Sequence, residues 1–223
     1  SKDTVIRYSR QIVNFLLSKN VKAIVVACNT ASALAMSQLQ KEYIVPMIGM
    51  VKPGAIAATR ATKNQHIGII GTNATIKSGQ YGRYLRKLNP EVTVVTKACP
   101  MFVPLVEEGL IDDRITEDMV SRYLREFDQY HIDSLILGCT HYPLLQNPIK
   151  NFVGKTVTLI NPAYETAKSL KELLKERGIA AGSGHTAEYE YYVSDMEDQF
   201  LTFADRVLPC HVENVQPIDI EKY

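Results

Sequence analysis

Apolar positions along the chain alternate between two spacings, one typical of helices and the other of buried strands. Residues 4–19 place Ile6, Val13 and Leu17 near one helical face, and residues 22–27 then have the length and composition of a buried strand. The same alternation predicts helices over residues 30–43, 52–63, 75–88, 116–130, 163–177 and 196–207, and strands over residues 45–49, 66–71, 91–98, 134–137, 156–160 and 189–194. Alternating strands and helices are typical of parallel sheets with helices on both faces, so the expected fold class is α/β.

A short internal repeat divides this pattern. The stretches VVACNTAS and LILGCTHYP each end an apolar strand in a cysteine, Cys28 and Cys139, and each is expected to open a helix. A second apolar strand follows each stretch, within VPMIGMVKPGA and VTLINPAYETA. We therefore expect two pseudo-symmetric parallel-sheet α/β domains with the active site in the cleft between them. Residues 1–52 form the first domain, residues 53–162 form the second, and residues 163–223 return to complete the first.

Both cysteines are expected where ligands of open α/β sheets bind, at the carboxyl ends of strands and against helix N-termini. Such a helix end suits a carboxylate ligand and favours the thiolate form of a cysteine. Polar side chains next to each thiol add hydrogen-bonding groups: Asn29, Thr30, Thr140 and His141. His141 is also placed to assist proton transfer, because an imidazole titrates near neutrality.

The simpler interpretation of these cysteines is packing, because a cysteine at the end of a buried strand usually behaves as a small hydrophobic residue. Two cysteines in matching settings favour a functional role instead. Cys99 and Cys210 lack that setting, and we expect them to be structural. The simpler interpretation of Glu107, in the segment PLVEEGL, is likewise a surface charge.

Composition narrows the class of protein. The chain has 223 residues, a net charge of +1, 46% hydrophobic residues and 22% charged residues, all ordinary for a folded domain. No basic excess indicates a nucleic-acid partner, and no apolar stretch is long enough to span a membrane. The four cysteines form no CxxC pair, which argues against a zinc site or a redox pair. We expect reduced thiols in a cytoplasmic protein with no bound metal.

Six stretches spread over most of the chain carry a family resemblance: VVACNTAS, GMVKPGA, IGIIGTNATIKSGQY, ACPMFVPLVEEGL, LILGCTHYPLL and YETA. They resemble the glutamate racemases of the cofactor-independent aspartate/glutamate racemase family. The resemblance implies interconversion of L- and D-glutamate, which supplies D-glutamate for peptidoglycan synthesis. It also implies no cofactor, an active site between two α/β domains, and a homodimer.

The resemblance assigns roles to individual residues. The two catalytic cysteines of the family fall on Cys28, facing D-glutamate, and Cys139, facing L-glutamate, with His141 supporting Cys139. Glu107 matches an acidic position of the family, which favours a role in the site. The family's substrate-contacting residues fall on Asn29, Thr30, Thr140 and His141.

The sequence departs from the family pattern in two places. The family begins with a strand and a DSGxGG loop, followed by a PYG segment, and all of these would precede Ser1. We therefore expect the chain to lack the N-terminal segment that carries an Asp and a Ser of the site. The stretch INPAYETA also replaces a DSG-type turn, through Asn161 and Pro162.

Alternatives to a glutamate racemase remain open at this point. An aspartate racemase, or a related racemase with paired cysteines, is the nearest alternative, because one sequence does not fix the side-chain length that the pocket accepts. A non-catalytic amino-acid-binding module is the alternative from a different class, and a thiol-redox protein is a third.

Overall fold

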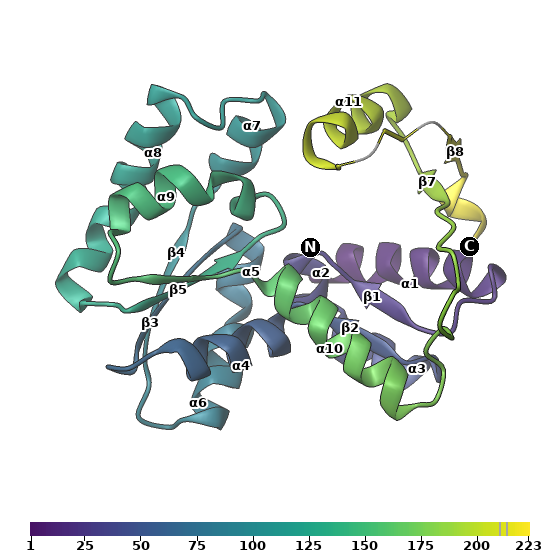
Figure 1. Cartoon of the computed structure of the whole chain (residues 1–223), viewed down its shortest axis with the longest axis horizontal. Helices are drawn as coiled ribbons and strands as arrows, with labels where there is room; N and C mark the ends of the chain where they lie inside the picture. The colour runs from purple at the N-terminus through teal and green to yellow at the C-terminus, as the bar shows by residue number, and fades with distance from the viewer. Residues whose placement is uncertain (210, 213) are drawn as a thin grey trace.

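The computed structural model describes residues 1–209, 211–212 and 214–223, and within them three parallel sheets are joined and covered by helices (Figure 1). The strands are β1 (Ile24–Val26), β2 (Met47–Gly49), β3 (His66–Gly71), β4 (Thr93–Ala98), β5 (Ser134–Gly138), β6 (Thr158–Ile160), β7 (Tyr191–Val193) and β8 (Val215–Pro217). The α-helices are α1 (Lys2–Ser18), α2 (Asn29–Leu34), α3 (Met36–Glu42), α4 (Val51–Ala61), α5 (Asn73–Ser78), α6 (Gln80–Leu88), α7 (Phe102–Glu107), α8 (Arg114–Leu124), α9 (Gln146–Val153), α10 (Pro162–Glu176) and α11 (Glu197–Val207). Three 3₁₀ helices are described: η1 (Arg125–Tyr130), η2 (Tyr142–Leu145) and η3 (Ile220–Lys222). Cys210 lies outside the described residues.

The largest sheet has the strand order β4-β3-β5-β6, with all neighbours parallel. Successive side chains of a strand point to opposite faces. Accordingly, Ile69 and Ile136 pack in one buried cluster with α4 and α6, whereas Ile70 and Leu137 pack in another with α7, α8 and α9. The sheet is therefore buried on both faces, as the continuous apolar runs in its strands predict.

A smaller sheet pairs β1 with β2 and packs against α1 and α3. In both sheets the strand that precedes a cysteine pairs in parallel with the next strand of the chain, β1 with β2 and β5 with β6. The expected pseudo-symmetric α/β fold is thus confirmed. The domain boundaries after residues 52 and 162 stay a prediction.

Helices α4 and α10 connect the two sheets. Helix α4 follows β2 in the chain but packs on β5 and β6, whereas α10 follows β6 and packs against α4 and β2 (Figure 1). The two helices approach closely at Gly54, where an added Cβ would lie 3.2 Å from Cβ of Pro162. Each helix therefore belongs by sequence to one sheet and packs partly on the other.

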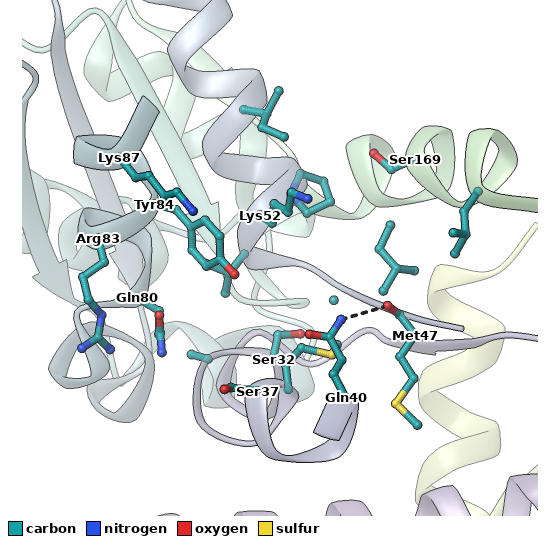
Figure 2. Close-up of a pocket in the computed structure, with 18 of the residues that line it drawn as sticks. Ser32, Ser37, Gln40, Met47, Lys52, Gln80, Arg83, Tyr84, Lys87 and Ser169 are labelled. Atoms are coloured by element: carbon teal, nitrogen blue, oxygen red, sulfur yellow. Dashed lines mark hydrogen bonds between the residues drawn. The ribbon is translucent and has the colours of Figure 1, made fainter. Parts of the chain in front are cut away.

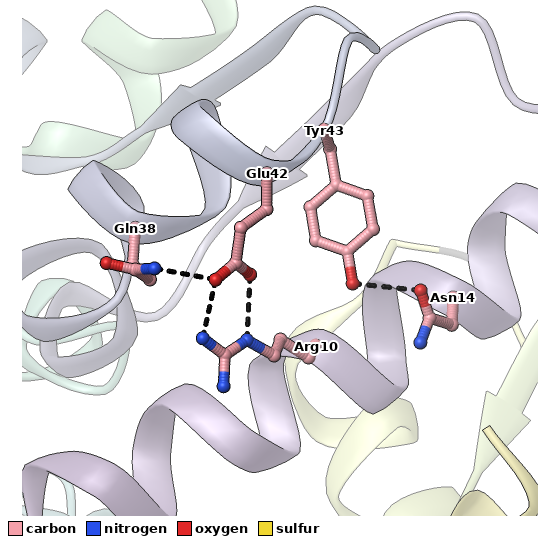
Figure 3. Close-up of polar contacts among 5 residues, drawn as sticks. All are labelled: Arg10, Asn14, Gln38, Glu42 and Tyr43. Atoms are coloured by element: carbon pink, nitrogen blue, oxygen red, sulfur yellow. Dashed lines mark hydrogen bonds and ion pairs between the residues drawn. The ribbon is translucent and has the colours of Figure 1, made fainter.

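Polar contacts fix α1 to the end of α3 (Figure 3). The Arg10 guanidinium donates two hydrogen bonds to the Glu42 carboxylate, at 2.7 and 2.5 Å, and Gln38 donates a third at 2.6 Å. The Tyr43 hydroxyl donates to Asn14 Oδ1 at 2.9 Å. These contacts position the helices that cover the smaller sheet.

The C-terminal strands β7 and β8 pair with each other and lie against α1 (Figure 1). The Phe15 ring meets the rings of Tyr192 and Tyr223 edge-on, with centroids 4.8 and 5.3 Å apart. Helix α11 contacts α7, which covers the larger sheet, because Arg206 donates to the backbone oxygen of Glu107 at 3.1 Å.

Several elements differ from the sequence prediction. The helix expected over residues 75–88 is divided into α5 and α6 because Gly79 adopts the left-handed conformation, with φ of 64°. The helix expected over residues 30–43 is divided at Ala35. Helices α7 and α9 and strand β8 were not predicted. Within the described residues, no helix has the length and hydropathy needed to cross a membrane.

Candidate active site

The carboxyl ends of β1, β3 and β5 converge on one small cavity of about 180 Å³. Its volume lies below the roughly 300–1,000 Å³ of sites for drug-sized ligands, so the cavity suits a much smaller molecule. The residues that line it are Cys28, Asn29, Thr30, Thr72, Val103, Gly138, Cys139, Thr140 and His141. All six residues predicted from the two cysteine stretches therefore come together, and Thr72 and Val103 were not foreseen.

The two thiols occupy different environments in the cavity. Cys28 is exposed and caps α2, with its Sγ accepting a hydrogen bond from the backbone N–H of Ala31 at 3.5 Å. Cys139 is buried, with 7% of its surface exposed. No α-helix begins at Cys139, because the 3₁₀ helix η2 starts three residues later at Tyr142. The expectation that both cysteines open helices is therefore wrong for Cys139.

Burial also reverses the expected ionisation of Cys139. Loss of solvent raises the pKa of the Cys139 thiol, and the negative charge of a Cys28 thiolate raises it further. Hydrogen bonds from the backbone of His141 and from Thr140 oppose this effect but do not outweigh it. The prediction of a lowered pKa at a helix N-terminus is thus wrong for this cysteine. A thiolate formed here is a stronger base than an ordinary one.

A chain of polar groups leads from Cys139 to the surface. His141 Nδ1 lies 3.9 Å from Cys139 Sγ and 3.3 Å from Thr140 Oγ1. On the other side of the ring, His141 Nε2 lies 3.2 Å from Glu107 Oε1. The Phe203 ring of α11 packs beside the imidazole, with centroids 5.6 Å apart. Glu107 is therefore not an isolated surface charge, since its carboxylate holds the histidine nearest the buried thiol.

Three threonine hydroxyls join the two sides of the cavity. Thr30 Oγ1 lies 2.9 Å from Thr72 Oγ1 and 3.1 Å from Thr75 Oγ1, and the latter two are also 3.1 Å apart. Thr30 is in α2, which follows β1, whereas Thr72 and Thr75 follow β3. The hydroxyl cluster therefore links the part of the cavity wall next to the smaller sheet to the part next to the larger sheet.

Asn29 is the most deeply buried polar residue of the cavity wall, with 2% of its surface exposed. Its Oδ1 accepts a hydrogen bond of 2.6 Å from the hydroxyl of Tyr81, on α6. Its Nδ2 is buried and has no partner among the described residues. The sequence pattern did not indicate a role in the site for Tyr81, which is 52 positions from Asn29.

A larger cavity of about 860 Å³ lies elsewhere, between α3, β2, α4, α6 and α10 (Figure 2). Lysine, arginine, glutamine and glutamate side chains line it, together with Tyr84. Among the described residues that line it there is no cysteine or histidine, so it lacks the paired thiols that distinguish the smaller cavity. The smaller cavity is therefore the candidate active site. Among the described residues, no group of three His, Cys, Asp or Glu side chains is placed to hold a metal ion.

Comparison with known proteins agrees with this assignment. The sequence model of the Asp/Glu/Hydantoin racemase family matches residues 3–170. The glutamate racemase of Geobacter metallireducens is 39% identical over 221 residues, which cover 99% of this chain and 82% of that protein. Among solved structures, glutamate racemase isoform RacE1 from Bacillus anthracis has a TM-score of 0.94 at 37% identity, covering 98% of this chain and 82% of that one. The glutamate racemase of Francisella tularensis, solved in complex with D-glutamate, has a TM-score of 0.92 at 32% identity, covering 100% and 83%.

The fold and these matches define an amino-acid racemase, an isomerase of the α/β class. The chain belongs to the Asp/Glu/Hydantoin racemase family. The resemblance drawn from the six sequence stretches is thereby confirmed.

Proposed function

We propose that the protein interconverts L- and D-glutamate by proton transfer between two thiols, without a cofactor. The observation that carries this proposal is the presence of Cys28 and Cys139 in one small cavity, at the ends of strands from two different sheets. The identity of the substrate rests on the glutamate racemases to which the chain is similar.

Inversion at the α-carbon requires a base on one face of the substrate and an acid on the other. In the proposed reaction a thiolate takes the α-proton, so the Cα–H bond breaks and an S–H bond forms. The opposite thiol then gives its proton to the other face of Cα and becomes the thiolate. Cys28 acts on D-glutamate and Cys139 on L-glutamate. The enzyme returns to its starting form when the two thiols exchange protons with solvent.

The environment of Cys139 suits the removal of a weakly acidic proton. Because burial raises the pKa of this thiol, its thiolate binds a proton more strongly than an ordinary cysteine does. His141 Nδ1, 3.9 Å from Cys139 Sγ, supports Cys139 by accepting the proton of the thiol when the thiolate forms, and Glu107 holds the far side of the imidazole. This chain of contacts supplies the base with a means of exchanging its proton with solvent.

The polar walls of the cavity are proposed to bind the substrate carboxylates and amino group. Asn29, Thr30, Thr140 and His141 provide amide, hydroxyl and imidazole groups around the two thiols. Hydrogen bonds from such donors to a carboxylate are charge-assisted and stronger than bonds between neutral groups. They would fix Cα between the two sulfur atoms.

We further propose that the protein is a cytoplasmic homodimer that supplies D-glutamate for peptidoglycan synthesis, and so acts in cell wall biogenesis and cell shape. These parts of the proposal are supported by the family resemblance and by the names of the relatives.

The test is exchange of the α-hydrogen of L- and D-glutamate in D₂O, followed by NMR and by circular dichroism of the amino acid. The protein should exchange and invert both enantiomers, whereas Cys28→Ala and Cys139→Ala should each lose inversion by at least about 10²-fold, as expected for removal of a proton-transferring group. Cys99→Ala is the matched control, because this thiol is buried outside the cavity.

The same assay separates the alternatives. Preferential turnover of L-aspartate would assign the protein to aspartate instead. Binding of glutamate with no deuterium at Cα would indicate an amino-acid-binding module. Activity that survives loss of either thiol would overturn the two-thiol mechanism.

A further inference from the structure

Of the two polar atoms of the Asn29 amide, one has a hydrogen-bond partner among the described residues and the other does not. Oδ1 accepts the 2.6 Å hydrogen bond from Tyr81, whereas Nδ2 is buried without a partner among the described residues. A buried N–H group with no acceptor is costly, so native structures rarely contain one unless a ligand or water satisfies it. Because Asn29 lines the cavity between the thiols, a ligand oxygen is the natural acceptor.

The hydroxyl of Tyr81 determines the orientation of the Asn29 amide. Its side chain is 3% exposed, and Asn29 Oδ1 is its acceptor among the described residues. Burial, and then the charge of a Cys139 thiolate, raise the pKa of Tyr81, so the phenol keeps its proton. A phenol proton needs an acceptor, and in the reversed amide the Nδ2 group would offer it none.

The Tyr81 ring is itself held from two sides. A Cβ on Gly54 would lie 3.2 Å from Cε1 of Tyr81, and a Cβ on Gly138 would lie 3.4 Å from Cε2. These glycines belong to α4 and to the end of β5, next to Cys139. The ring is thus fixed by the larger sheet and its covering helix, while its hydroxyl reaches Asn29 beside Cys28.

We propose that Tyr81 is a positioning residue, which orients the Asn29 amide so that Nδ2 donates to a carboxylate of the substrate. Tyr81 does not line the cavity and so acts through Asn29. If the amide reversed, Oδ1 would face the carboxylate, and an attraction would become a repulsion. The inference rests on the proposed racemisation of glutamate.

The first test is the steady-state kinetics of Tyr81→Phe with L- and D-glutamate. The variant keeps the ring between Gly54 and Gly138 and removes only the donor. KM should rise about tenfold, the effect of losing one hydrogen bond to a charged group, while kcat changes much less. The matched control is Tyr43→Phe, which removes another tyrosine-to-asparagine hydrogen bond, of 2.9 Å, far from the thiols (Figure 3).

A double variant tests whether Tyr81 acts through Asn29. In an Asn29→Ala background, Tyr81→Phe should add less than about twofold to KM, because the two residues form one unit. Asn29→Asp gives an independent check that needs no change at Tyr81. It keeps an acceptor for the phenol but replaces the N–H donor by a carboxylate oxygen, so KM should rise more than in Tyr81→Phe.

The outcomes separate this inference from the proposed function. A protein that leaves glutamate unchanged overturns the proposed function, and the inference with it. An active protein in which Tyr81→Phe alters KM no more than Tyr43→Phe overturns the inference alone. The inference is also overturned if the effects of Tyr81→Phe and Asn29→Ala on KM multiply in the double variant, or if Asn29→Asp leaves KM unchanged.

Discussion

His141 Nε2 lies 3.2 Å from Glu107 Oε1, although the two residues are 34 positions apart and Glu107 lies at the end of α7. The contact fixes the imidazole with its other nitrogen toward Cys139. A carboxylate that accepts from one side of a histidine ring selects the tautomer and orientation of the ring. The acidic position in PLVEEGL is therefore connected to the buried thiol through a single side chain.

Glu107→Gln should lower kcat about 10- to 100-fold, less than the loss of a group that transfers the proton itself, about 10²–10⁴-fold. The amide still fills the space but no longer favours one tautomer of His141. Steady-state racemisation in both directions measures the effect. Glu108→Gln is the control, because this adjacent carboxylate is exposed and makes no contact with His141 in the described structure. Equal activity of the two variants would contradict the role of Glu107.

Gly138→Ala should impair both folding and activity. The new Cβ would lie 2.6 Å from the backbone oxygen of Ile70, on the neighbouring strand, so β5 must shift next to Cys139. Such overpacking costs about 1–3 kcal/mol. Gly79→Ala provides the comparison, because no atom of the described residues lies within 4 Å of its added Cβ and only the left-handed φ of 64° is unfavourable. Chemical denaturation should show both variants destabilised, while only Gly138→Ala loses turnover.

Glu42 should make stability depend on acid pH. The Arg10 guanidinium, and then Gln38, lower the pKa of the Glu42 carboxyl from 4.5 to about 2. Since the folded value lies below the unfolded one, the stabilisation is present above pH 4.5 and is lost as the pH falls through about 2. Glu42→Gln should therefore lower Tm at pH 6 and converge with the unchanged protein near pH 2. Adding Arg10→Gln to that variant should lower Tm little further. A second decrease in Tm as large as the first would exclude the ion pair as the cause.

Cys99 should contribute to a loss of stability in alkali. It is fully buried, and this burial raises the pKa of its thiol above the ordinary value of 9.0. The unfolded chain therefore ionises first, and stability declines as the pH rises above about 8.5. Cys99→Ala should be less stable at pH 7 but lose less on raising the pH, as followed by thermal unfolding. An unchanged alkaline slope would show that other buried groups dominate.

The sequence was informative about the thiols because their chemistry is local. Cys28 and Cys139 each follow an apolar run and a matching second strand, and two similar units that face each other bring both cysteines to one site, so their meeting follows from the repeat. The ionisation of Cys139 did not follow, because it depends on burial by residues distant in the chain and on the absence of an α-helix at that point.

Tyr81 shows where the pattern carries no information. Its spacing in α6 indicates only a residue on the buried face of a helix, and its hydroxyl contact with Asn29 depends on how α6 meets the end of another sheet. The division of the preceding helix had a visible sign in Gly79, but an isolated glycine is also tolerated within helices. The division at Ala35 had no sign in the sequence.

The crossing of α4 and α10 has a mechanical consequence. Each helix is attached to one sheet and packed partly on the other, so the sheets are interlocked, and any relative movement takes the form of shear between packed helices. The distance between the strand ends that carry Cys28 and Cys139 is then partly set where Gly54 meets Pro162, outside the cavity. A bulkier side chain at position 54 would therefore change the spacing of the two thiols without the substitution of any residue of the cavity wall.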